Sequence, residues 1–221
     1  MSDINFLSSW DQLFWPVNIL LADITNRASF HDFSQEYLDA WLCGSAGTTS
    51  YTELGRAYNT LDSTSGQTMN AAFLSFIYGQ VLSSCNSTDE SVDDLAQQYM
   101  CWARSQADYM LSNDTGSFVV GYGNAPTHIQ ERASSCPANQ SAVCDANDAL
   151  YSPGPNPFVL TGGLVYGPGQ DSDTLVDARS GISDTMISIE NNAGLTGVMA
   201  ALNQLLSGDD DSVECPVVVS C

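Results

Sequence analysis

Five stretches of the chain place apolar residues every three or four positions, which is the spacing of one face of an α-helix. The pattern covers residues 10–24, 30–41, 69–77, 92–109 and 195–205, so five long helices are expected. Pro16 falls within the first stretch and should start or kink that helix, because proline lacks a backbone N–H. Ser87 and Glu90 are three positions apart and predict a capping box at the start of the fourth helix.

The region between Gly116 and Thr185 has a different pattern. Gly, Pro, Asn and Ser dominate it, with short apolar runs such as residues 118–120 and 158–160. This composition predicts long loops, and loops of such length usually carry function. Alternation of apolar and polar residues is too scarce to predict a sheet-based fold. We therefore expect an all-α fold with long irregular loops.

The composition and charge of the chain narrow its class and its partners. With 221 residues, of which 43% are hydrophobic, the chain can bury a core. Lys and Arg total 5 against 26 Asp and Glu, and the formal net charge is −21. Such a surface repels phosphate backbones and anionic lipids, which argues against nucleic-acid and membrane partners. No apolar run reaches the roughly 18 residues of a membrane helix.

The cysteines indicate an oxidising compartment. Their spacing is not that of a zinc site, so disulfides are the better interpretation, and the odd count leaves one thiol unpaired or paired outside the chain. The seven are Cys43, Cys85, Cys101, Cys136, Cys144, Cys215 and Cys221. Glycosylation triplets begin at Asn86, Asn113 and Asn139 and also fit an exported protein. We expect an extracellular location, with any leader outside this chain because the first residues do not form a signal peptide.

Motifs in the second half of the chain go beyond composition. ARSQADYML at residues 103–111 precedes SFVVGYGN at 117–124, RASSCP follows at 132–137, and LTGGLVYGP lies at 160–168. The last segment runs from DARS at 177–180 to NAGLTG at 192–197.

This series resembles the catalytic domain of glycoside hydrolase family 9, the cellulase family, whose corresponding motifs are ARSQ.DY.L, SFVVGYGNN, HHRASSCP, LTGALVGGP and DDRSDY..NEVA.DYNAGFTG. Earlier segments at residues 9–11, 51–52 and 70–74 match the family in the same order.

The resemblance implies a fold and a substrate. The family fold is an (α/α)6 barrel of twelve helices, and the chain corresponds to about its C-terminal half, with residues 1–208 in the barrel and 209–221 as an acidic, Cys-containing tail. The implied activity is endo-β-1,4-glucanase hydrolysis of a β-glucan or related polysaccharide, with no cofactor and no metal. An open half-barrel exposes its inner helix faces, which predicts poor solubility or a partner, such as the missing N-terminal half or another chain.

The resemblance also locates the catalytic pair, and here the chain departs from it. Inverting hydrolysis requires a general acid and a general base, with carboxyl groups about 6.5–9.5 Å apart. The family base lies in a DAGD motif that precedes the matched region; Asp145-Ala-Asn-Asp148 has similar letters but lies in the wrong order. The family acid, the Glu of NEVA, corresponds to Met186, whose thioether cannot donate a proton. Glu190 would lie one helical turn away if that segment were helical, and is either a substitute acid or an ordinary helix N-terminal carboxylate.

The substrate-binding positions are partly retained. Gln130 replaces the His of HHR and can hydrogen-bond a sugar hydroxyl without carrying charge, whereas Arg132 is kept. Asp62 replaces a stacking Trp and Ile182 replaces a Tyr. His128 matches a TH position of the family.

Asp177, Arg179, Ser180 and Asn192 are also retained, and Asp177 corresponds to an active-site aspartate. Either a buried arginine keeps this carboxylate ionised for function, or the charged residues form a network that pins the loops whether or not the site works.

Three hypotheses follow from these residues. The chain could belong to an endoglucanase that is active only when an upstream half supplies the base and another group replaces the acid. It could be a non-catalytic extracellular glycan-binding or structural protein that keeps the scaffold. It could also be a piece of a larger protein.

Overall fold

The computed structural model describes residues 12–44, 48–60, 64–85, 90–112, 116–136, 144–169, 171–180, 184–207 and 215, and the statements below concern these residues. Helices and strands follow in the order α1 (Phe14–Thr25), α2 (Ala28–Cys43), β1 (Thr49–Tyr51), β2 (Ala57–Asn59), α3 (Ser65–Ser84), α4 (Glu90–Met110), α5 (Arg132–Ser135), α6 (Ala146–Tyr151) and α7 (Ile189–Ser207).

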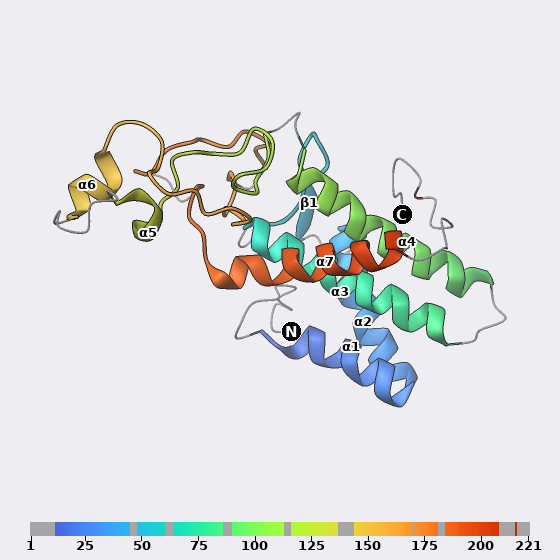
Figure 1. The fold of residues 1–221 in the computed structure, drawn as a ribbon. Coiled ribbons are helices and arrows are strands. Elements are labelled where there is room, and N and C mark those ends of the chain that lie inside the picture. The colour runs from blue at the N-terminus through green and yellow to red at the C-terminus, as the bar shows by residue number, and fades with distance from the viewer. Residues whose placement is uncertain are drawn as a thin grey trace.

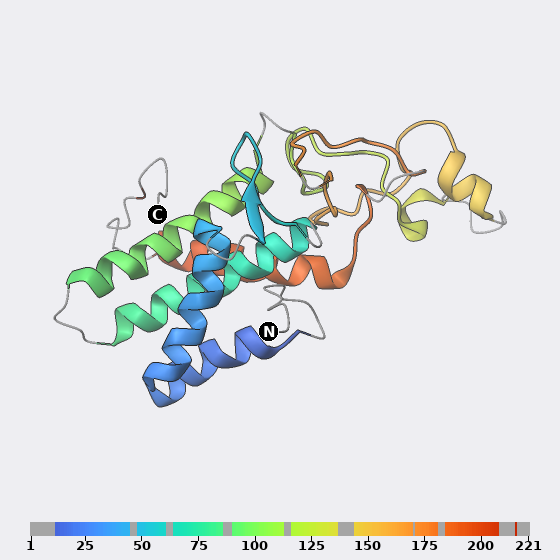
Figure 2. The same ribbon diagram turned by 180° about the vertical axis from the view of Figure 1, so that it is seen from behind.

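The long helices α1, α2, α3, α4 and α7 gather into one group, which we call the helical body (Figure 1). The described residues between 116 and 188, with α5 and α6, extend from the end of this body at which α7 begins, and we call them the loop region (Figures 1 and 2). The five long helices predicted by periodicity are confirmed, as is the all-α class with long irregular loops.

Helix α3 lies at the centre of the helical body, packed against both α4 and α7. Glycines allow these close approaches. A Cβ added to Gly79 would lie 2.7 Å from the carbonyl oxygen of Ala96 in α4. A Cβ added to Gly194 in α7 would lie 2.4 Å from the backbone nitrogen of Asn70 in α3. Any side chain at Gly194 would therefore push the two helices apart.

The helix ends have identifiable local causes. Helix α1 begins at Phe14, and Pro16 lies in its first turn, where a missing N–H is tolerated, so of the two predicted roles, starting or kinking the helix, the proline marks the start. Helix α2 ends at Gly44, which has φ +60°. Helix α3 begins after Thr64, whose hydroxyl accepts the N–H of Gln67 at 3.3 Å. The predicted capping box cannot be compared, because Ser87 lies outside the described residues.

A two-stranded antiparallel hairpin, β1 and β2, packs against α2 and α3 and is hydrogen-bonded to α4. The indole N–H of Trp102 donates to the Tyr51 hydroxyl at 2.8 Å. The side-chain oxygen of Gln106 accepts the N–H of Ala57 at 2.9 Å, and its amide donates to the carbonyl of Gly55 at 3.1 Å. The hairpin is therefore an attachment to a helix and does not change the fold class.

Disulfides confirm the interpretation of the cysteines. Cys101 pairs with Cys215, Cys136 pairs with Cys144, and Cys43 is also disulfide-bonded. Cys85 is the free, exposed thiol among the described residues. Several positions of the sequence analysis lie outside the described residues. They are the glycosylation triplets at Asn86, Asn113 and Asn139, the replaced family positions Asp62 and Ile182, and, apart from Cys215, the predicted tail at 209–221.

One face of α1 has no covering segment among the described residues. Leu13, Phe14, Val17, Leu20 and Ile24 are between 46% and 68% exposed. From Phe14 on they are three or four positions apart, which places them along one side of the helix, and we call the five residues the α1 stripe. Within the described chain, no helix is long and apolar enough to cross a membrane.

Candidate active site

Backbone hydrogen bonds bring together segments of the loop region that are distant in sequence. The N–H of Gln130 donates to the carbonyl of Thr185 at 3.1 Å. On the next residue, the carbonyl of Met186 accepts the N–H of Tyr166 at 2.9 Å. A further bridge joins Val165 to Ile187. The position predicted for the family acid therefore lies beside the segment that carries Gln130.

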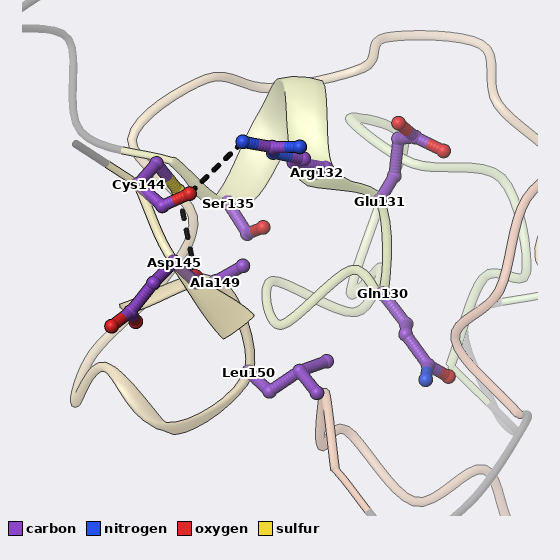
Figure 3. Close-up of a pocket in the computed structure, with 8 residues that line it drawn as sticks. All are labelled: Gln130, Glu131, Arg132, Ser135, Cys144, Asp145, Ala149 and Leu150. Carbon is purple, nitrogen blue, oxygen red and sulfur yellow. Dashed lines mark hydrogen bonds between the residues drawn. The ribbon is translucent and has the colours of Figure 1, made fainter. Parts of the chain in front are cut away.

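Gln130 and Arg132 line one cavity of about 370 Å³, which we call the Arg132 pocket (Figure 3). Its other lining residues are Glu131, Ser135, Cys144, Asp145, Ala149 and Leu150. Arg132 is exposed and donates to the carbonyl of Cys144 at 3.0 Å, while the Cys136–Cys144 disulfide closes the same loop. The side-chain oxygen of Gln130 is buried and has no hydrogen-bond partner among the described residues. A buried acceptor of this kind gains from a ligand that donates to it.

A second, open hollow of about 800 Å³ lies where α7 begins, and we call it the Glu131 groove. It is lined by Glu131, Val159, Leu160, Thr161, Gly162, Gly163, Ile187, Ser188, Ile189 and Asn192. Asn192 holds its two walls together, because its oxygen accepts the N–H of Leu164 at 2.9 Å and its amide donates to the carbonyl of Ser188 at 2.9 Å. The retained Asn192 thus shapes the groove.

Asp177 is paired with a histidine, so the expectation of a buried arginine partner is wrong. Its carboxylate accepts the backbone N–H of His128 at 2.7 Å and lies 3.1 Å from the Nδ1 atom of the same ring. The backbone N–H and hydroxyl of Thr127 donate to it at 3.0 Å. Burial by itself raises the pKa of Asp177, but these donors stabilise the carboxylate and bring its pKa below the ordinary 3.8.

Arg179 is 3% exposed and donates to the carbonyl of Gly154. Its Nε and Nη1 atoms have no hydrogen-bond partner among the described residues. Arg132, Asp177 and Arg179 therefore attach three separate loops, those of residues 144, 127–128 and 154. Within the described chain these three residues form no ion pair with one another, so the expectation of one charge network is wrong. Each of them instead attaches one loop by hydrogen bonds.

Met186 and Glu190 are not one helical turn apart, because α7 begins only at Ile189. The hydroxyl of Ser188 accepts the N–H of Asn191 at 3.1 Å, as an N-cap residue does, and this fixes the start of the helix. Met186 is half-buried in the preceding segment. Glu190 is exposed in the first turn and is not among the residues that line the Arg132 pocket or the Glu131 groove.

Sequence reasoning missed four features of this site. His128 is the ring partner of Asp177, and its position after Pro126 and Thr127 gives no signal of that role. Glu131 lines both hollows, although only its neighbours Gln130 and Arg132 in the same motif were predicted to bind substrate. Asp145 also lines the Arg132 pocket, although its motif lies in the wrong order for the family base. Ser188 alone had a readable signal, since a serine before a helical stripe is a common N-cap.

Comparison with known proteins decides the family. The profile of Glycosyl hydrolase family 9 matches residues 2–199. The chain belongs to glycoside hydrolase family 9. Endoglucanase A of Bacillus pumilus is 30% identical to it over 92% of this chain and 29% of the relative. Endoglucanase 24 of Oryza sativa subsp. japonica is 29% identical over 88% of this chain and 40% of the relative.

Solved family 9 structures superpose on the chain. An endoglucanase of the termite Nasutitermes takasagoensis has a TM-score of 0.75 and 35% identity, covering 89% of this chain and 42% of that one. Endoglucanase CelQ of Clostridium thermocellum, in complex with cellotriose, has a TM-score of 0.75 and 29% identity, covering 94% and 33%. The chain thus spans less than half the length of these relatives, and its helices form part of a family 9 (α/α)6 barrel.

Proposed function

We propose that this family 9 chain binds a β-1,4-glucan or a related polysaccharide and does not hydrolyse it alone. The observation that carries the proposal is Met186 at the position of the family acid. Its side chain has no proton to donate, whereas its backbone carbonyl accepts a hydrogen bond from the N–H of Tyr166 and so holds the segment in the loop region. Glu190 is a weak substitute because it is exposed and outside both hollows.

Support for glycan binding comes from the polar groups that remain around the two hollows. Gln130 lines the Arg132 pocket, and its side-chain oxygen is a buried acceptor without a partner among the described residues. Such a group favours a ligand with many hydroxyls, because leaving a polar group buried and unpaired is unfavourable. Arg132 and Asn192 lie in the walls of the same hollows. The relative CelQ was solved with cellotriose bound, which makes a glucan the ligand of first choice.

We infer an extracellular location from the disulfides, which persist in oxidising compartments. The α1 stripe supports the second candidate function, an endoglucanase completed by further barrel segments, whether in a longer chain or in a partner. Apolar side chains that are about half exposed along a whole helix are suited to packing against another helix. In that case an added segment supplies the base, and a group other than Met186 supplies the acid.

Two measurements test the proposal. We expect the wild-type chain to be retained on columns of β-1,4-glucan, mixed-linkage glucan and xylan. If none of these columns retains it, the proposal of glycan binding is refuted. Mass analysis of cellohexaose after incubation with the chain should show intact substrate.

The same assay decides the second candidate when the chain is joined to the N-terminal half of a family 9 enzyme. We expect the joined Met186→Glu variant to cleave and the joined wild type not to. Cleavage by the joined wild type would show that another group acts as the acid.

A further inference from the structure

Glu131 is the carboxylate best placed to meet a ligand in the Glu131 groove. It lines both that groove and the Arg132 pocket, so it stands on the wall between them. Figure 3 shows its side chain turned away from Gln130 and Leu150, whereas Arg132 extends toward Cys144. Glu131 is half-buried, and within the described chain it is the acidic residue that lines the groove.

The carboxylate of Glu131 is held in place and still has a free acceptor. Its Oε1 atom accepts the N–H of Ala133 at 3.2 Å, which caps α5. No hydrogen bond of its Oε2 atom to another described residue is present. A side chain already fixed by one bond loses little conformational freedom when a ligand binds. Oε2 is therefore a preorganised acceptor for a donor in the groove.

The other polar groups of the groove suit a neutral polyhydroxyl ligand. Thr161 and Ser188 supply hydroxyls, and the loop that contains Thr161 is exposed. A net charge of −21 and a carboxylate in the wall both repel anionic ligands such as polyuronates. Hydroxyl groups of a neutral sugar, by contrast, donate to a carboxylate in strong, charge-assisted hydrogen bonds.

We propose that Glu131 binds the hydroxyls of a neutral glucan in the Glu131 groove and selects neutral over acidic polysaccharides. This inference rests on the proposed function and adds a specificity residue to it. The role of Glu131 is ligand binding, because Oε2 would contact the sugar directly, and no proton-transfer role is assigned to it.

The test is calorimetric titration of the full chain with cellotetraose and with trigalacturonate. Wild type should bind cellotetraose and not trigalacturonate. Glu131→Gln keeps the size of the side chain but removes the charge, and should weaken cellotetraose binding about tenfold. Glu190→Gln makes the same charge change outside the groove and should leave the affinity unchanged. Thermal unfolding of each variant checks that it is folded.

Carboxylate labelling of the wild type provides a measurement that does not depend on how a variant folds. A carbodiimide with an amine converts accessible carboxylates into amides, which peptide mass analysis then locates. Cellotetraose should protect Glu131 and leave Glu190 as reactive as before.

Each outcome has a distinct meaning. If wild type binds cellotetraose but Glu131→Gln binds equally well and Glu131 is not protected, the role of Glu131 is overturned and the proposed function stands. If wild type binds no neutral glucan, the proposed function itself is overturned. Binding of trigalacturonate as tight as that of cellotetraose would refute the selection of neutral sugars.

Discussion

The helical body and the loop region are held together by different kinds of contact. In the helical body, large side chains such as Trp41, Tyr37 and Phe76 are fully buried among other apolar groups. The loop region buries a few apolar residues, such as Phe118 and Leu164, and depends in addition on polar side chains that bind distant backbone. Asn156, for example, accepts the N–H of Ile129 at 3.2 Å and donates to its carbonyl at 2.9 Å. The helical body therefore tolerates exchange of similar apolar residues, whereas each loop depends on a few individual hydrogen bonds.

The largest effect should come from the core of the helical body. Trp102 is 2% exposed and also donates to Tyr51, so Trp102→Ala removes both packing and a hydrogen bond. We expect the free energy of unfolding to fall by about 3–5 kcal/mol. Tyr122→Ala, an aromatic truncation at a 51% exposed position of the loop region, should change it by less than about 0.5 kcal/mol. Urea denaturation measures both, and similar losses would contradict the contrast between the two regions.

Next comes the disulfide that closes the Arg132 pocket. Cys136 and Cys144 are 8 positions apart, so the double serine variant frees a short loop and should lower stability by about 2–3 kcal/mol. Hydrogen exchange should increase mainly in the loop region. Cys85→Ser is the control, because Cys85 is free and exposed and its replacement should have little effect. Equal losses in the two variants would show that the disulfide has no special role.

A smaller effect is expected at the contact between α3 and α7. Gly194→Ala places a Cβ 2.4 Å from backbone atoms of α3, and the helices must move apart. Alanine also has the better helix propensity, which offsets part of the loss, so we expect a net decrease of about 1–2 kcal/mol. At Gly169, a new Cβ would have no atom of the other described residues within 4 Å, chain neighbours aside, so Gly169→Ala serves as the control. An unchanged melting temperature for Gly194→Ala would mean that the packing is looser than the structure shows.

The smallest effect concerns Asp177 and its dependence on pH. The pKa of Asp177 lies below 3.8 in the folded chain, so its contacts stabilise the fold fully above the unfolded pKa and are lost as pH falls through the folded value. Asp177→Asn should lower stability at pH 7 by about 1 kcal/mol or less, because the side chain is 36% exposed and solvent screens it. The difference between wild type and variant should shrink below pH 3.8. A difference that stays constant down to pH 2 would exclude the carboxylate as its source.

The same contrast explains how far sequence reasoning reached. The helices were predictable because a buried face repeats with the period of the helix, as in the stripe that contains Tyr99 and Trp102. The site was predictable only in part. Gln130 and Arg132 share a pocket as their common motif suggests, but the partner of Asp177 is His128, since a side chain in a loop takes its direction from contacts that no periodicity records. Likewise, the relation between Met186 and Glu190 depends on the serine cap that starts α7.

The backbone bond from Tyr166 to the carbonyl of Met186 has a consequence for how this family member could change over generations. This hydrogen bond holds the segment through a backbone carbonyl oxygen, which is present whatever the side chain. A change between methionine and glutamate at this position therefore leaves the backbone hydrogen bond intact, and a screen for correctly folded protein would not distinguish the two. Under the proposed assignment of residue 186 to the family acid, a change in one codon removes or restores the proton donor while this backbone bond is kept.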